Sequence, residues 1–155
     1  IREMRITKED IQDLAGAQLL GLDIHDRSKH RLSLVTEEIF AGKRVYILSV
    51  EPAILPNPHK MRERFFRGRL WIDAETFQII KVRGIAEPSG KQRFPVFQTF
   101  RSCVSPTLCL PSRTEADDIL RFPKRDVNFR IRVRYYDYKI FASRVKVTEI
   151  GEASN

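Results

Sequence analysis

One stretch, residues 65 to 84, limits the folds open to this chain more than any other. Two apolar, β-prone runs, Leu70 to Ile72 and Phe77 to Val82, flank the polar segment from Asp73 to Thr76. A short polar insert between two such runs is typical of a β-hairpin. Trp71, the only tryptophan, lies on the first arm. Its indole needs a large apolar neighbour and an acceptor for its N–H, so we expect the hairpin to face a sheet interior or a ligand cavity.

The rest of the chain repeats the order strand, turn, strand. A period of two predicts strands at residues 32–34, 44–51 and 94–103, and a turn at residues 40–43. Residues 108–120 predict either a further strand pair or one bent strand. The apolar residues of Arg44 to Glu51 fall on both faces, which favours a central position in the sheet. We therefore predict a mainly β protein with a curved antiparallel sheet of about seven or more strands.

One helix is predicted near the N-terminus. Thr7 supplies an N-cap hydroxyl, Glu9 and Asp10 place acids in the first turn, and apolar residues then follow at three-to-four spacing. The helix is expected from about Lys8 to Leu20, where it would cover the sheet.

A late segment, Phe129 to Phe141, predicts the longest strand. Its first half alternates an apolar row with a cationic row, Arg130, Arg132 and Arg134. That row is either a solvated outer face or a contact for an anionic group such as phosphate or a lipid headgroup. After Tyr135 the alternation slips by one residue, which predicts a β-bulge near Tyr135 and Tyr136.

The net charge limits the classes of binding partner to anionic ones but does not select among them. The chain has 155 residues, which is the size of one domain. Its formal net charge of +8 permits attraction to nucleic acid, anionic lipid or acidic protein. Nucleic acid is disfavoured because the aromatic residues of the late strand lie opposite its arginines. No apolar run approaches the roughly 20 residues that a membrane-spanning helix needs. The start at Ile1 favours a portion of a longer protein that lacks its N-terminal part.

Few residues suggest covalent chemistry. Cys103 and Cys109 flank a turn with proline, and they are either a disulfide or two separately buried thiols. The three histidines, His25, His30 and His59, fall in predicted surface loops, so no metal site is expected. Asp73 and Glu75 could form an acid/base pair, but Asp favours turn geometry at this place. Without a phosphate-binding glycine loop or a nucleophile elbow, we predict no enzyme and no cofactor.

Four motifs carry a resemblance to a known family. They are Gly42 to Leu48, Gly68 to Gly84, Leu110-Pro111-Ser112, and Tyr135-Tyr136-Asp137-Tyr138-Lys139-Ile140-Phe141. The chain resembles, over roughly residues 42 to 141, the bacterial outer-membrane lipoprotein-sorting proteins related to the periplasmic lipoprotein carrier. This resemblance implies an unclosed barrel with helices over its hollow. It also implies binding of lipid or acyl chains in the periplasm, without catalysis.

These expectations give one candidate function and one alternative. The candidate is a single domain, residues 1–155, that binds a lipid or the acyl group of a lipidated protein in the hollow. The lining is expected to include some of Tyr46, Leu48, Trp71, Phe97, Tyr135 and Tyr138. A further partner could be an anionic membrane surface or an acidic protein on the arginine row. The alternative is a structural or protein-interaction domain with a filled core and a basic contact face.

Overall fold

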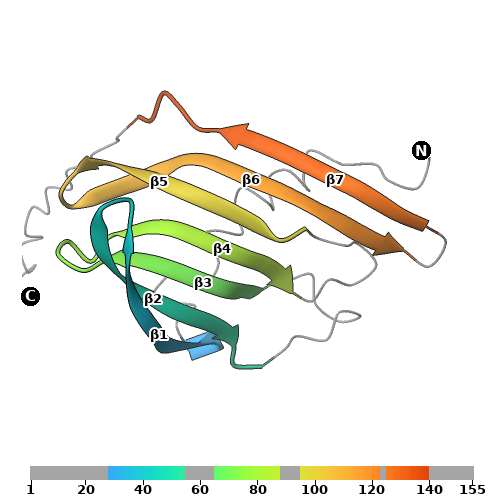
Figure 1. Ribbon diagram of the computed structural model, residues 1–155, viewed down its shortest axis with the longest axis horizontal. Coiled ribbons are helices and arrows are strands. Elements are labelled where there is room, and N and C mark those ends of the chain that lie inside the picture. Colours follow the sequence, from blue (N-terminus) through green and yellow to red (C-terminus); the bar gives the residue numbers. More distant parts are fainter. Residues whose placement is uncertain (1–27, 55–64, 88–94, 123–124, 140–155) are drawn as a thin grey trace, which may run out of the picture.

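The computed structural model describes residues 28–54, 65–87, 95–122 and 125–139, and these residues form one antiparallel sheet (Figure 1). Its strands are β1 (His30–Phe40), β2 (Lys43–Pro52), β3 (Phe65–Asp73), β4 (Ile79–Glu87), β5 (Phe97–Ser105), β6 (Leu108–Phe122) and β7 (Arg125–Arg134). They lie side by side in chain order from β1 to β7. The prediction of a mainly β, antiparallel fold is confirmed.

The sheet is open. β1 and β7 form its two edges and are not paired with each other, so the described strands do not close into a barrel. The described ranges contain no α-helix. The helix predicted over residues 8–20 lies outside them, and the expected helical cover of the sheet therefore has no support in the described part.

The central hairpin is confirmed, but both arms are longer than predicted and the second begins at Ile79 rather than Phe77. β3 and β4 pair from Phe65 with Glu87 to Ile72 with Ile79. Between them, the Asp73 carboxylate accepts hydrogen bonds from the backbone N–H groups of Glu75 at 2.9 Å and Thr76 at 3.0 Å. Such a side chain replaces a missing backbone acceptor and fixes the turn. Phe77 completes the reversal in the left-handed region, with φ of 56°.

Other strands differ from the prediction in length. β1 reaches Phe40 through a register shift between Leu34 and Thr36, and β6 is one strand of 15 residues. β7 ends at Arg134 and residues 135–139 are not in a strand, so the predicted continuation of the strand beyond Arg134 and the bulge near Tyr135 are wrong, while residues 140 and 141 lie outside the described ranges. Tyr135 N still donates to Ser112 O at 3.0 Å, but Asp137 then takes a φ of 57°. The slip in the sequence pattern marks the end of the strand.

Most of the core lies on one side of the sheet, which we call the apolar face. Its buried cluster consists of Val50, Phe66, Leu70, Val82, Ala86, Phe97 and Ala116. Gly68 and Gly84 face each other across β3 and β4 on this side, and the ring of Phe66 lies against both. The two glycines provide the space that the Phe66 ring occupies.

The β1–β2 hairpin bends over the other side of the sheet (Figure 1). Trp71 Nε1 on β3 donates to Glu38 Oε1 on β1 at 2.8 Å, although β2 lies between the two strands. The ring of Phe40 also reaches Lys81 on β4, with Nζ 5.1 Å from the ring centre. Beneath this hairpin lies a second buried cluster, formed by Val45, Ile47, Trp71, Ile80 and Cys109.

Candidate functional site

The apolar face carries most of the predicted ligand-lining residues. Leu48 packs against its core cluster and Phe97 belongs to that cluster. Tyr46 shares the face of Leu48 by strand alternation. The Tyr135 hydroxyl reaches the same side, where it lies 3.0 Å from Thr114 Oγ1. Thr114 in turn bonds to Thr99, Oγ1 to Oγ1 at 2.6 Å, so this buried polar group is satisfied across β5 and β6.

Burial on the apolar face decreases toward one edge of the sheet. Val50 on β2 and Val82 on β4 are completely buried. On β7, in contrast, Phe129 and Ile131 pack against the cluster but stay half-buried. Along the row Phe97, Ala116 and Ile131 the apolar face therefore continues from the buried centre to the edge strand. Polar side chains flank this row: the Thr99–Thr114 pair on one side and Asp118, opposite Phe129, on the other.

Trp71 and Tyr138 do not join that set. Trp71 alternates with Leu70 and lies on the opposite side, in the second buried cluster. The Tyr138 hydroxyl donates to Pro111 O at 2.5 Å and its side chain is exposed. The six residues expected to line one hollow thus do not converge on one cavity.

The Trp71 ring instead packs against a lysine. Lys81 Nζ lies 4.4 Å from the Trp71 ring centre, 5.4 Å from that of Phe100 and 5.1 Å from that of Phe40. An ammonium over aromatic faces is held by the ring quadrupoles. Burial lowers the pKa of Lys81, and Arg83 lowers it further, whereas Glu38 opposes both. Sequence reasoning missed this cluster, because its members become neighbours only through the register of four strands.

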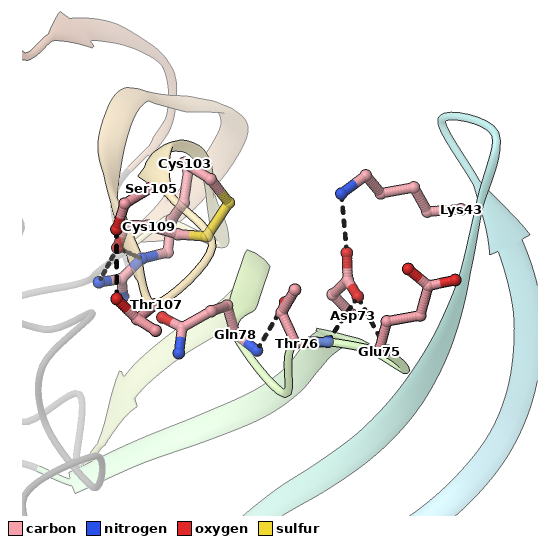
Figure 2. Close-up of a disulfide and its surroundings, with 10 residues drawn as sticks. Lys43, Asp73, Glu75, Thr76, Gln78, Cys103, Ser105, Thr107 and Cys109 are labelled. Carbon is pink, nitrogen blue, oxygen red and sulfur yellow. Dashed lines mark hydrogen bonds and ion pairs between the residues drawn. A yellow bond between two sulfur atoms is a disulfide. The ribbon is translucent and has the colours of Figure 1, made fainter.

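A second set of contacts stabilises the hairpin end of the sheet (Figure 2). Lys43 Nζ, in the turn end of the β1–β2 hairpin, bonds to Asp73 Oδ2 at 2.9 Å. Asp73 is only 3 % exposed. The hydrogen bond from Lys43, followed by those from Thr76 and Glu75, lowers the pKa of Asp73 from 3.8 to about 2. The same hydrogen bond raises the pKa of Lys43. Asp73 is therefore a structural anion of the turn rather than one half of an acid/base pair.

Cys103 and Cys109 are joined by a disulfide at the tip of the β5–β6 hairpin (Figure 2). The two residues lie directly opposite each other, with Cys103 exposed and Cys109 buried. The Arg101 guanidinium supports the same tip, since Nη2 and Nε donate to Cys109 O at 3.0 and 3.2 Å. Burial lowers the pKa of Arg101.

Replacing both cysteines by serine should lower the free energy of unfolding by about 2 kcal/mol, the loop-closure value for so short a loop. Urea unfolding of the oxidised protein and of the Cys103→Ser/Cys109→Ser variant measures the difference. The oxidised protein treated with a reductant should unfold at the midpoint of the variant. A variant as stable as the oxidised protein would contradict a stabilising role for the bond.

In the arginine row of β7, one of the three side chains forms an ion pair within the described part of the chain. Arg130 Nε bonds to Asp117 Oδ2 on β6 at 2.7 Å, a contact between two exposed side chains. Beside it lies an open groove of about 500 Å³, lined by Arg83, Val96, Phe97, Gln98, Glu115, Ala116, Asp117, Asp118, Arg130, Ile131 and Arg132. Three arginines and three acids make this groove mixed in charge, so it is not a simple anion pocket.

The described part of the chain offers no candidate metal site. No three His, Cys, Asp or Glu side chains gather there in a way that could hold a metal ion. His30 was expected in a surface loop, but it begins β1 and is buried, edge-on to the Phe65 ring at 5.5 Å between ring centres. Among the described residues no helix has the length and apolar character to span a membrane.

The fold and these contacts define an open, seven-stranded antiparallel sheet protein with one apolar side. Comparison with known proteins does not narrow this class: no family model, curated protein or solved structure matches the chain.

Proposed function

We propose that this protein binds a lipid, or the acyl group of a lipidated protein, noncovalently along its apolar face. The observation that carries the proposal is the apolar row Phe97, Ala116 and Ile131, which runs from the buried centre to half-buried side chains on the edge strand β7. Because the sheet is open, an acyl chain could approach from that edge without separating any pair of strands. Burial of each methylene would contribute about 0.8 kcal/mol.

The contacts assigned to the ligand follow from that geometry. Five partly buried side chains on this face would cover an acyl chain: Leu48, Ile72, Ile79, Phe129 and Ile131. Phe97, which is almost completely buried, would form the floor beneath them. Tyr46 and Tyr135 would lie at the margins of the same face. Such binding forms no covalent bond and requires no catalytic group.

The disulfide supports a location outside the cytosol. Structural disulfides form and persist in oxidising compartments, of which the bacterial periplasm is one. The bond between Cys103 and Cys109 agrees with the periplasmic location that the family resemblance implies.

The proposal predicts that Ile131→Asp weakens binding of a fluorescent fatty acid at least about tenfold, because a carboxylate would replace an apolar contact on β7. Titration of the ligand with purified protein measures the affinity. Ile119→Asp is the matched control, since Ile119 lies on the neighbouring strand β6, is 54 % exposed and faces the opposite side of the sheet. The control should bind like the original protein.

Two results would contradict acyl binding. One is a native protein that takes up no fatty acid and yields no lipid on organic extraction. The other is equal weakening by Ile131→Asp and Ile119→Asp with unchanged unfolding midpoints. The first result would instead favour a structural or protein-interaction domain with a filled core.

A further inference from the structure

Opposite the apolar face, β3 to β7 present a second surface with a strong excess of positive charge, which we call the basic face. Strand alternation and exposure assign eight arginines to it: Arg67, Arg69, Arg83, Arg113, Arg121, Arg130, Arg132 and Arg134. The same rule assigns it fewer acids: Glu87, Glu115, Asp117 and Asp126. The arginines come from four strands, so only the folded sheet brings them together.

The strand register places like charges directly opposite each other on this face. Arg69 on β3 pairs with Arg83 on β4, and Arg113 on β6 pairs with Arg134 on β7. Like charges at directly opposed positions destabilise a sheet. Local rules of stability are broken most often where a surface has a binding role. An anionic partner would offset the repulsion at both places.

The acids of the basic face neutralise only some of its arginines. Arg67 bonds to Glu87 at 3.0 Å, Arg113 to Glu115 at 3.5 Å and Arg130 to Asp117 at 2.7 Å. Within the described ranges, no ion pair or side-chain hydrogen bond engages the remaining exposed arginines of β3, β4 and the end of β7: Arg69, Arg83, Arg132 and Arg134. One register row contains three of these four: Arg69, Arg83, Gln98, Glu115 and Arg132.

We infer that the basic face docks on the surface of a bilayer that contains anionic lipids. Strands lie about 4.8 Å apart, so five strands make a surface roughly 20 Å wide, which can meet several headgroups at once. Arginines at such a surface pair with lipid phosphates and contribute about 1 kcal/mol each. Each free guanidinium on this face is a candidate for one such contact.

Two features favour a bilayer over nucleic acid. Single-stranded nucleic acid binds sheets through open aromatic rings. On the basic face, however, Trp71 is 8 % exposed and lies under Lys81, and the Phe100 ring is covered by Arg113 at 4.2 Å. In addition, Glu115 and Asp117 lie among the arginines, where they would repel a uniformly anionic polymer. A bilayer with mixed headgroups can place neutral lipids at those positions.

Docking on the basic face is independent of acyl binding, because the two surfaces are on opposite sides of the sheet. The test is flotation of the protein with vesicles of phosphatidylcholine alone and with vesicles that also contain phosphatidylglycerol. We expect binding only to the second kind, weakened by added salt. The variant Arg83→Gln/Arg132→Gln should bind these vesicles roughly thirtyfold more weakly.

The control variant Arg44→Gln/Arg125→Gln loses the same net charge from exposed positions off the basic face, and it should bind like the original protein. Equal weakening by the two variants, equal binding to both kinds of vesicle, or tighter binding to a single-stranded oligonucleotide would each overturn the inference. If the partner is an acidic protein instead, the protein should bind neither kind of vesicle. Fatty-acid titration in solution measures acyl binding without vesicles, so failure of docking and failure of acyl binding are distinguishable.

Discussion

The substitution Gly84→Ala is expected to lower the free energy of unfolding by about 3 kcal/mol or to prevent folding. A Cβ atom at Gly84 would overlap the carbonyl oxygen of Arg67 on the paired strand and the ring of Phe66. Neither group can withdraw easily. The carbonyl belongs to the β3–β4 ladder, and Phe66 is buried and packs against Phe97 with ring centres 6.1 Å apart.

Gly42→Ala is the matched control for this prediction. No atom lies within 4 Å of a Cβ built at Gly42, so only its positive φ of 78° opposes the change. That strain costs about 1–2 kcal/mol. Urea unfolding followed by circular dichroism measures both variants. If the two substitutions cost the same, close approach of β3 and β4 would not be the reason for glycine at position 84.

The substitution Asp73→Ala should cost about 2–3 kcal/mol. It removes a buried carboxylate that accepts from two backbone N–H groups and from Lys43. Those two N–H groups would lose their acceptors, and the β1–β2 and β3–β4 turns would lose their common ion pair. The exposed neighbour Glu75 is the control, because Glu75→Ala keeps the backbone N–H that donates to Asp73. Thermal unfolding of the two variants should therefore differ clearly.

The same carboxylate sets a pH dependence. The folded pKa of Asp73 is about 2, below its ordinary value of 3.8. Stabilisation by the charged form is therefore complete above about pH 4 and is lost as pH falls toward 2. Since Lys43 is exposed to solvent, screening reduces this contribution to roughly 1–2 kcal/mol. Asp73→Asn should flatten the stability curve between pH 4 and 2. An unchanged acid slope in Asp73→Asn would contradict the role of the carboxylate.

Local chemistry explains which parts of the fold could be predicted from sequence. The β3–β4 hairpin depends on Asp73 and on apolar runs close to it in the chain, so the pattern alone indicated it. The extent of β1 could not be read in this way, because its far half is exposed on both faces and is defined by pairing with β2. Nor did the alternation around Tyr135 distinguish a bulge from a strand end.

The functional surfaces were predictable within strands but not between them. Alternation on β7 correctly separated Arg130, Arg132 and Arg134 from its apolar residues. It could not show that Arg69 and Arg83 share their side of the sheet, because that relation depends on pairing across β4, β5 and β6. For the same reason Trp71 was grouped with Leu48 and Phe97, which lie on the other side.

The bent β1–β2 hairpin has a consequence for how the protein would come apart. Glu38 and Phe40 connect the first edge strand to β3 and β4, so β1 cannot detach without uncovering the indole of Trp71 and releasing its N–H. Because Trp71 is the single tryptophan, the wavelength of its fluorescence maximum reports detachment of β1 separately from local unfolding at β7. The protein thus contains an intrinsic fluorescent probe for local unfolding at one of the two edges of its sheet.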